Sequence, residues 1–158
     1  MQPELVAANG RRFAGFAAAV LVFIMNDDRR VLLLRSPRRS RGWEIVNGGL
    51  EAGETLLDGV AREVAEEAGP DVRIDVLGTA HAMTWHYDDE VPHMISTFFV
   101  ARHLGGEVMP GDDMAGSEVR WATLEEVRAL VAAGEPTVPG ELEIFERAFA
   151  VAELWWPR

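Results

Sequence analysis

Two apolar runs near the start of the chain are separated by a short polar stretch. The first run covers residues 13–25 and the second covers residues 31–35. An Asn-Asp pair followed by arginines between two such runs is typical of a turn, so the pattern predicts a β-hairpin with its turn at residues 26–29. A further short strand is predicted at "WEIV", residues 43–46, which leads into paired glycines.

The pattern becomes helical over residues 53–69. Apolar residues recur three and four apart, which places them on one stripe of a helix: Leu57, Val60, Ala61, Val64 and Ala68. Thr55 is the expected N-cap, and Asp58 stands in the capping-box position. Gly69-Pro70 is a strong stop signal, so the helix is expected to end there.

Alternation of apolar and polar residues returns after this helix. It predicts strands near residues 72–77, 80–87 and 94–102, with a polar turn at residues 88–90. "SEVRWAT" predicts one more strand, which runs into a helix capped by Thr123 with Glu126 in the capping-box position. A last amphipathic helix is expected over residues 141–154. The whole pattern predicts an α/β fold, with a central mixed sheet and helices packed against it, in a single domain over residues 1–158 (core about 12–155).

Composition and charge narrow the class of protein. The chain has 158 residues, is 48% hydrophobic and carries a formal net charge of −11. A negative surface disfavours binding to a nucleic-acid polymer, although a bound divalent cation would still allow a small phosphorylated ligand. The absence of cysteine excludes disulfides and thiolate metal sites and fits a cytoplasmic location. The first apolar run is too short to span a bilayer, so no membrane association is expected.

Carboxylates are concentrated on the predicted central helix. Glu63, Glu66 and Glu67 lie within one turn, and Arg62 stands four residues before Glu66. Like charges at this spacing destabilise a helix, so the clustering of three glutamates needs an explanation. Clustered carboxylate oxygens suit Mg²⁺ or Mn²⁺, and Gly48 could add a backbone carbonyl. An acidic helix face exposed to solvent is the alternative.

The spacing of these residues resembles the Nudix box, G-x5-E-x7-R-E-U-x-E-E-x-G-U, where U is aliphatic. Gly48 opens it, Glu54 follows after five residues, and "REVAEEAG" completes it at residues 62–69. Only Pro70, in the final aliphatic position, departs from the pattern. The stretch before it, "WEIVNGGLEAGE", resembles the lead-in of the family, with Val46 where proline is usual. The resemblance implies the Nudix fold, an α/β/α sandwich around a mixed sheet.

The resemblance also implies roles for the residues of the box. Nudix enzymes are hydrolases that cleave a diphosphate linkage in a nucleoside diphosphate joined to a group X, with Mg²⁺ or, as a substitute, Mn²⁺. Glu63, Glu66 and Glu67 would hold the metal with the Gly48 carbonyl, and one of these acids or a downstream acid would activate water. Arg62 would hold a neighbouring glutamate in place, and Glu54 would support the loop or a further metal. Glu118, Asp112 and Asp113 are the downstream candidates.

The residues that would bind the substrate are less narrowly defined. Four arginines before the box could clamp phosphates: Arg35, Arg38, Arg39 and Arg41. Trp43 and Trp85 could stack on a base, although a tryptophan in a strand also suits the core. Tyr87, about seventeen residues past the box, stands where the diadenosine polyphosphate hydrolases of the family tend to have a tyrosine. An exposed basic loop is the alternative for the arginines.

The most specific expectation is a MutT-like nucleotide pyrophosphatase that releases a nucleoside monophosphate from a nucleoside triphosphate. An ADP-ribose, nucleotide-sugar or dinucleoside polyphosphate hydrolase is the alternative enzyme, and a non-catalytic Nudix-like binding module is the alternative of another class. The expected partner is a small nucleotide, and the protein would be a monomer or homodimer.

Overall fold

A mixed eight-stranded sheet forms the centre of the computed structural model, which describes residues 3–156. Its main path runs β10-β5-β4-β3-β8-β7, with β6 added to β3 and β9 added to β4. The strands of this sheet are β3 (Ala17–Met25), β4 (Val31–Arg35), β5 (Trp43–Glu44), β6 (Val46–Gly49), β7 (Arg73–Trp85), β8 (Met94–Gly105), β9 (Glu118–Ala122) and β10 (Thr137–Val138). β3 is parallel to β8 and antiparallel to β4 and β6, which confirms the mixed sheet.

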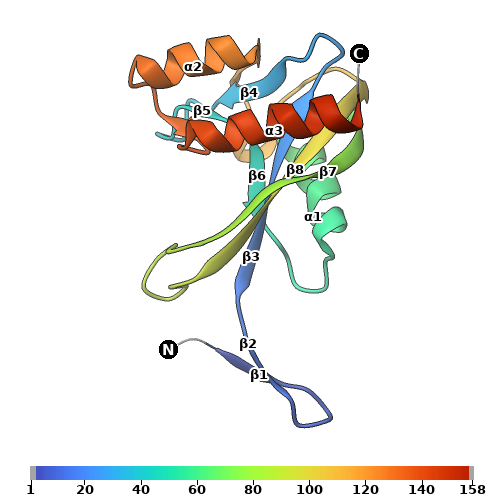
Figure 1. Cartoon of the computed structure of the whole chain (residues 1–158), viewed down its shortest axis with the longest axis vertical. Coiled ribbons are helices and arrows are strands. Elements are labelled where there is room, and N and C mark those ends of the chain that lie inside the picture. Colours follow the sequence, from blue (N-terminus) through green and yellow to red (C-terminus); the bar gives the residue numbers. More distant parts are fainter. Residues whose placement is uncertain (1–2, 157–158) are drawn as a thin grey trace.

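Strand β3 is apolar throughout because both of its faces are covered. Leu21, Phe23 and Met25 belong to the core on one face of the sheet, together with residues of α2 (Leu124–Ala132) and α3 (Leu142–Trp155). The residues between them, such as Val22, pack on the other face with α1 (Leu56–Glu63). The result is the expected α/β/α sandwich, in which α3 crosses one face of the sheet (Figure 1).

The predicted helix is made of two segments. Thr55 and Asp58 form the predicted capping box at the start of α1. A π-helical turn, η1 (Val64–Ala68), then follows directly, and the Gly69 N–H donates to the Val64 carbonyl over 3.1 Å. A π-turn inside a helix often marks a functional site. Here it carries two of the three clustered glutamates.

The predicted apolar stripe of this helix is only partly correct. Val60, Val64 and Ala68 are buried, but Leu57 is 57% exposed and Ala61 is exposed. Glu63 and Glu67 take part in the buried face instead. The helix therefore turns its carboxylates toward the sheet and not directly away from it.

The N-terminal end departs most from the predicted elements. The run at residues 13–25 is not one strand, since β2 (Arg12–Ala14) pairs with β1 (Glu4–Val6) in a separate two-stranded sheet. We call residues 3–16 the arm; it projects from the main body (Figure 1). The two strands predicted near residues 72–87 are one bulged strand, β7. Within residues 3–156 the structure has no helix long and apolar enough to span a membrane.

Candidate active site

The first box glycine lies directly against a box glutamate. A Cβ placed on Gly48 would lie 1.9 Å from Glu63 Oε1, which is closer than any real contact. β6 brings this glycine to the helix by pairing with β3, where Gly48 is opposite Val20. A side chain at this position would require the Glu63 carboxylate to move, because that carboxylate lies directly against the backbone of β6. Burial raises the pKa of Glu63.

Glu67 is the most enclosed of the three box glutamates, with 2% of its surface exposed. Its Oε1 accepts a hydrogen bond from Arg39 over 2.8 Å, and its Oε2 accepts one from the Asn47 backbone N–H over 2.8 Å. Burial raises the pKa of Glu67 to about 7, although both hydrogen bonds act in the opposite direction. A carboxyl group with this pKa exchanges its proton near neutrality.

Arg62 links the box helix to the loop before it. Its guanidinium donates to Glu54 Oε1 over 2.7 Å, to Glu63 Oε1 over 2.6 Å and to Glu66 Oε2 over 3.1 Å. It also donates to the Gly49 carbonyl over 2.8 Å. Hydrogen bonds from Arg62 lower the pKa of Glu54 to about 2, so this carboxylate is charged. These contacts fit the positioning role that the resemblance implies for Arg62 and a loop-supporting role for Glu54.

Glu44 and Asn47 also belong to this site, and neither was predicted from the sequence. The Glu44 side chain is fully buried, and its Oε2 accepts from the Asn47 amide over 3.2 Å and from Arg39 over 3.4 Å. Its Oε1 is buried without a hydrogen-bond partner. Glu44 thus supports the two groups that hold Glu67. The sequence signal that could have identified Glu44 is its place in the "WE" of the stretch before the box.

Oxygen donors of the kind that a hard divalent cation prefers are present at this site. In residues 3–156, however, no three acidic, histidine or cysteine side chains are gathered around one point as metal ligands. Arg62 lies between Glu63 and Glu66, and Arg39 lies beside Glu67. The donor set and the close Gly48–Glu63 approach fit a divalent cation, which would replace some of these arginine contacts.

A cavity of about 430 Å³ opens beside the glycines of β6. Gly48, Gly49, Asn47, Arg39 and Arg41 line one side of it. Ser96, Glu141 and apolar and aromatic residues line the rest, and Trp85 and Tyr87 are the two exposed rings, with centroids 5.7 Å apart. The cavity thus joins cationic groups and an aromatic wall, and two of its lining residues, Gly48 and Arg39, lie against Glu63 and Glu67.

Three of the predicted substrate-binding residues do not line this cavity. Arg35 pairs with Glu118 through two nitrogens and lies over the Trp43 ring at 4.6 Å. Trp43 is 6% exposed and belongs to the core, as its alternative interpretation held. Arg38 donates to the Asp112 carbonyl over 3.3 Å.

The downstream acid that reaches the cluster is Asp113. Its Oδ2 accepts from Nε of Arg39 over 3.1 Å, and the same guanidinium holds Glu67. The carboxylate of Glu118 is instead engaged by Arg35, across strands β4 and β9. The structure therefore links Asp113, and not Glu118, to the box.

Comparison with known proteins identifies the family. The model of the NUDIX domain matches residues 15–142, so the chain belongs to the Nudix hydrolase family. It is 30% identical to the NAD-capped RNA hydrolase NudC of Pseudomonas aeruginosa over 77% of this chain and 41% of the relative. It is 28% identical to the protein of the same name from Deinococcus radiodurans over 91% of this chain and 49% of the relative. The chain thus spans less than half of the length of these curated relatives.

Solved structures show the same fold. The crystal structure of a MutT protein from Methanosarcina mazei Go1 matches with a TM-score of 0.65 and 25% identity, covering 84% of this chain and 92% of that one. An ADP-ribose pyrophosphatase from Streptococcus suis matches with a TM-score of 0.66 and 19% identity, covering 87% and 92%. The match to the ADP-ribose pyrophosphatase, at 19% identity, shows a shared fold alone. The expected α/β Nudix fold is confirmed.

Proposed function

We propose that the chain hydrolyses a diphosphate linkage in a nucleotide with the help of a divalent cation, Mg²⁺ or Mn²⁺. The observation that carries this proposal is the position of the Gly48–Glu63 approach at the edge of the cavity. Glu63, one of the carboxylates that would hold the cation, thereby lies against a residue that lines a space large enough for part of a nucleotide. Glu63, Glu66, Glu67 and the Gly48 carbonyl are the proposed ligands. When bound, the cation screens the charge of the diphosphate, polarises phosphorus and lowers the pKa of its water.

The side chains of the protein then have distinct tasks. Arg62 fixes the carboxylates of Glu63 and Glu66 relative to the loop through its bond to the Gly49 carbonyl. Arg39 and the backbone of Asn47 fix both oxygens of Glu67. Held in this way, Glu67 is the proposed base or orienting group for the attacking water. Asp113 would support it indirectly, by accepting a hydrogen bond from Arg39.

The substrate we propose first is a nucleoside triphosphate, cleaved to a nucleoside monophosphate and pyrophosphate. One cavity with one aromatic wall, formed by Trp85 and Tyr87, suits a single nucleoside. Arg41, which is half exposed at the cavity, would contact the phosphates. The likeness to a MutT structure agrees with this choice.

A dinucleotide is the second candidate, because the curated relatives carry the name NAD-capped RNA hydrolase. The net charge of −11 led us to expect no nucleic-acid polymer. That expectation lacks support, since the name of these relatives includes RNA. We therefore keep a capped RNA end among the candidate substrates, alongside ADP-ribose and nucleotide sugars.

The test is a panel of substrates with purified protein in Mg²⁺ and in Mn²⁺. It contains nucleoside triphosphates, ADP-ribose, NAD, a nucleotide sugar, a dinucleoside polyphosphate and a NAD-capped RNA. Pyrophosphate with a nucleoside monophosphate supports the first candidate, whereas cleavage of NAD or NAD-capped RNA into two monophosphate products supports the second. Binding without product from any substrate would favour the non-catalytic module.

A further inference from the structure

Arg39 contacts a box glutamate and also lines the cavity proposed for the nucleotide. Its Nη2 donates to Glu67 Oε1 over 2.8 Å, and its side chain borders the cavity of about 430 Å³. Its Nε donates to Asp113 Oδ2 over 3.1 Å, and its Nη1 lies 3.4 Å from Glu44 Oε2. All three nitrogens of this guanidinium therefore contact acidic side chains, so a phosphate in the cavity would compete with them for Arg39.

The contact between Arg39 and Glu67 is largely shielded from water. The side chain of Arg39 is 15% exposed, and that of Glu67 is 3% exposed. Removing one partner of an ion pair in such surroundings leaves a buried charge without compensation, which is strongly unfavourable. Either residue can therefore leave the other only when a group of suitable charge takes its place.

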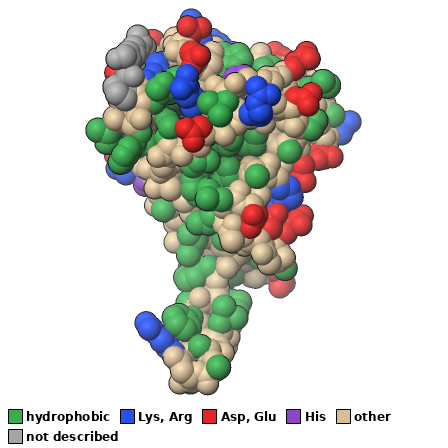
Figure 2. Space-filling view, turned by 90° about the vertical axis from the view of Figure 1, so that its right-hand side faces the viewer, with side chains coloured by type: hydrophobic (Ala, Val, Ile, Leu, Met, Phe, Trp, Pro, Cys, Tyr) green, Lys and Arg blue, Asp and Glu red, His purple; other side chains and the backbone are tan. Residues whose placement is uncertain are grey.

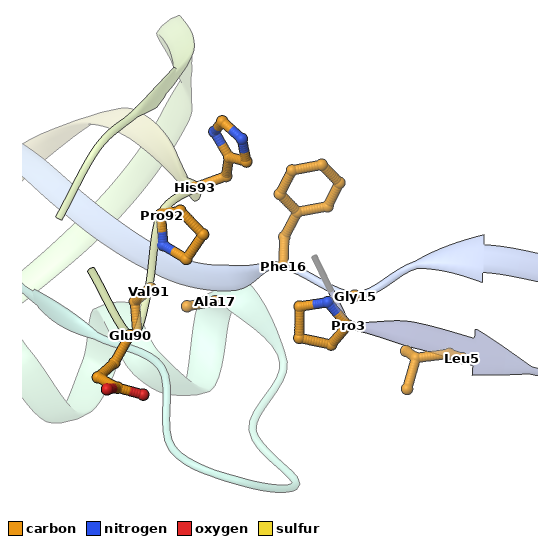
Figure 3. Close-up of a pocket in the computed structure, with 9 residues that line it drawn as sticks. All are labelled: Pro3, Leu5, Gly15, Phe16, Ala17, Glu90, Val91, Pro92 and His93. Carbon is orange, nitrogen blue, oxygen red and sulfur yellow. The ribbon is translucent and has the colours of Figure 1, made fainter. Parts of the chain in front are cut away.

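Cationic groups that could receive an anionic substrate are scarce. The chain carries a net charge of −11, and acidic side chains gather along the right edge of the main body in Figure 2. Among residues 3–156, Arg39 and Arg41 are the only basic side chains that line the nucleotide cavity. A separate cavity of about 320 Å³ at the base of the arm has Glu90 and His93 in a mostly apolar lining and no arginine (Figure 3). Arg39 released from Glu67 would thus provide a second guanidinium beside Arg41.

We propose that Arg39 couples the binding of the divalent cation to the binding of the nucleotide. Oε1 of Glu67 can contact either Arg39 or the cation, and Arg39 can contact either Glu67 or a phosphate of the nucleotide. Binding of the cation thus frees the guanidinium for the phosphate, and binding of the phosphate frees the carboxylate for the cation. Such coupling is reciprocal, because each ligand changes the affinity for the other by the same factor. The inference rests on the proposed function.

Arg62 does not have the same position, although it also contacts box glutamates. It donates to Glu54 and to the Gly49 carbonyl as well, and it does not line the cavity. When a cation takes the box glutamates from Arg62, these loop contacts still hold its guanidinium. Arg39 is therefore the residue that links the two ligands.

Cation binding without nucleotide gives the first test. Arg39→Gln removes the guanidinium that competes for Glu67, so this variant should bind Mn²⁺ more tightly than the wild type by about fivefold or more. Arg38→Gln is the matched control, because Arg38 lies in the same loop, carries the same charge and donates to the Asp112 carbonyl outside the cavity lining. Its affinity for Mn²⁺ should stay within about twofold of the wild type. Electron paramagnetic resonance of free Mn²⁺ measures these affinities.

A purely structural role for Arg39 predicts the opposite sign, since a damaged site would bind Mn²⁺ more weakly. Equal or weaker binding by Arg39→Gln therefore overturns the proposal. Circular dichroism establishes that each variant is folded. If Arg39→Gln does not fold, Arg39→Lys takes its place with the same expected direction, because a single ammonium does not reproduce the fork of a guanidinium. Absence of Mn²⁺ binding in the wild type and all variants would reject the metal site itself, and both the proposed function and this inference with it.

Binding of inorganic pyrophosphate in excess chelator gives the second test, because it reports on phosphate recognition without a cation or a base. Glu67→Gln weakens the contact with Arg39, so this variant should bind pyrophosphate more tightly than the wild type by about fivefold or more. Combining Arg39→Gln with Glu67→Gln should abolish that gain, as a double-mutant cycle requires when the two residues act together. Isothermal titration calorimetry measures the affinities.

Glu66→Gln is the control for charge in the second test. It removes the same charge from the box, but Glu66 contacts Arg62 and not the cavity arginines. Its affinity for pyrophosphate should stay within about twofold of the wild type. The proposal is overturned if Glu67→Gln shows no gain, if Glu66→Gln gains as much, or if the gain persists in the double variant.

Discussion

The carboxylate of Glu63 occupies the space in which a side chain on Gly48 would stand, with its Oε1 1.9 Å from the ideal Cβ position. Gly49, the next residue, has no such constraint, because its nearest neighbour would lie 4.0 Å from an added Cβ. Comparing substitutions at Gly48 and Gly49 therefore distinguishes a need for glycine next to Glu63 from a need for a flexible loop.

Gly48→Ala should displace the Glu63 carboxylate and lower kcat/KM by about 100-fold or more, as expected when a positioned catalytic group moves. Gly49→Ala should lower it less than about threefold, which corresponds to less than ~1 kcal/mol. Steady-state kinetics of the two variants makes the comparison. Equal losses would show that the approach of Gly48 to Glu63 has no special role.

The buried carboxyl of Glu67 should make metal-free protein less stable as the pH rises. Its pKa is about 7 in the folded chain, against 4.5 for an ordinary glutamate in water. The folded state thus favours the protonated form, and this stabilisation is complete below about pH 4.5 and is lost as the pH rises through about 7. Glu67→Gln, which resembles the protonated form, should therefore raise Tm at pH 8 in chelator more than at pH 5. Thermal unfolding at both pH values checks this, and a difference independent of pH would contradict it.

Two arginines of the loop before the box should differ in their effect on substrate binding. Arg41 lines the cavity, whereas Arg38 is bonded to the Asp112 carbonyl outside its lining. Arg41→Ala should raise KM severalfold at low salt and less at high salt, because salt screens the attraction to phosphates. Arg38→Ala serves as the control and should leave KM within about twofold. A larger effect at Arg38 than at Arg41 would point to a different path for the substrate.

Asp113 and Glu118 offer a similar comparison for the downstream acid. Asp113 is connected to Glu67 through Arg39, and Glu118 is paired with Arg35. Asp113→Asn should lower kcat by about tenfold, within the range for a residue that orients a ligand. Glu118→Gln should change kcat less than about twofold, as for an exposed ion pair. A larger loss of kcat in Glu118→Gln than in Asp113→Asn would instead identify Glu118 as the downstream acid of the site.

Features of the fold that depend on residues close together in the sequence, such as the starts of helices, were predicted from the sequence. Both capping boxes, at Thr55 and Thr123, form as predicted. The break between β2 and β3 was not visible, because residues 13–25 are apolar on both sides of it. Spacing also could not show that η1 is a π-turn, which places Glu67 in the buried face beside Val64.

The spacing of the box places Glu63 and Glu66 beside Arg62 on one helix, and Arg62 contacts both, whereas Glu67 contacts Arg39 and Asn47 instead. Contacts between distant segments were harder to predict. Arg39 reaches Glu67 across 28 positions, and only the fold distinguishes it from Arg38. Glu44 was missed for the same reason, because its burial results from the strands around it.

Turnover by wild type and Glu67→Gln, side by side in Mg²⁺ and in excess chelator, is the most direct test of metal-dependent hydrolysis at the box glutamates. The variant keeps the size of the side chain and removes one charge at the proposed metal site. We expect the wild type to hydrolyse a nucleotide of the panel only with Mg²⁺ or Mn²⁺, and Glu67→Gln to be slower by about 10²- to 10⁴-fold. Full turnover of the wild type in chelator, or a loss below about tenfold in Glu67→Gln, would contradict a metal-dependent mechanism at the box glutamates.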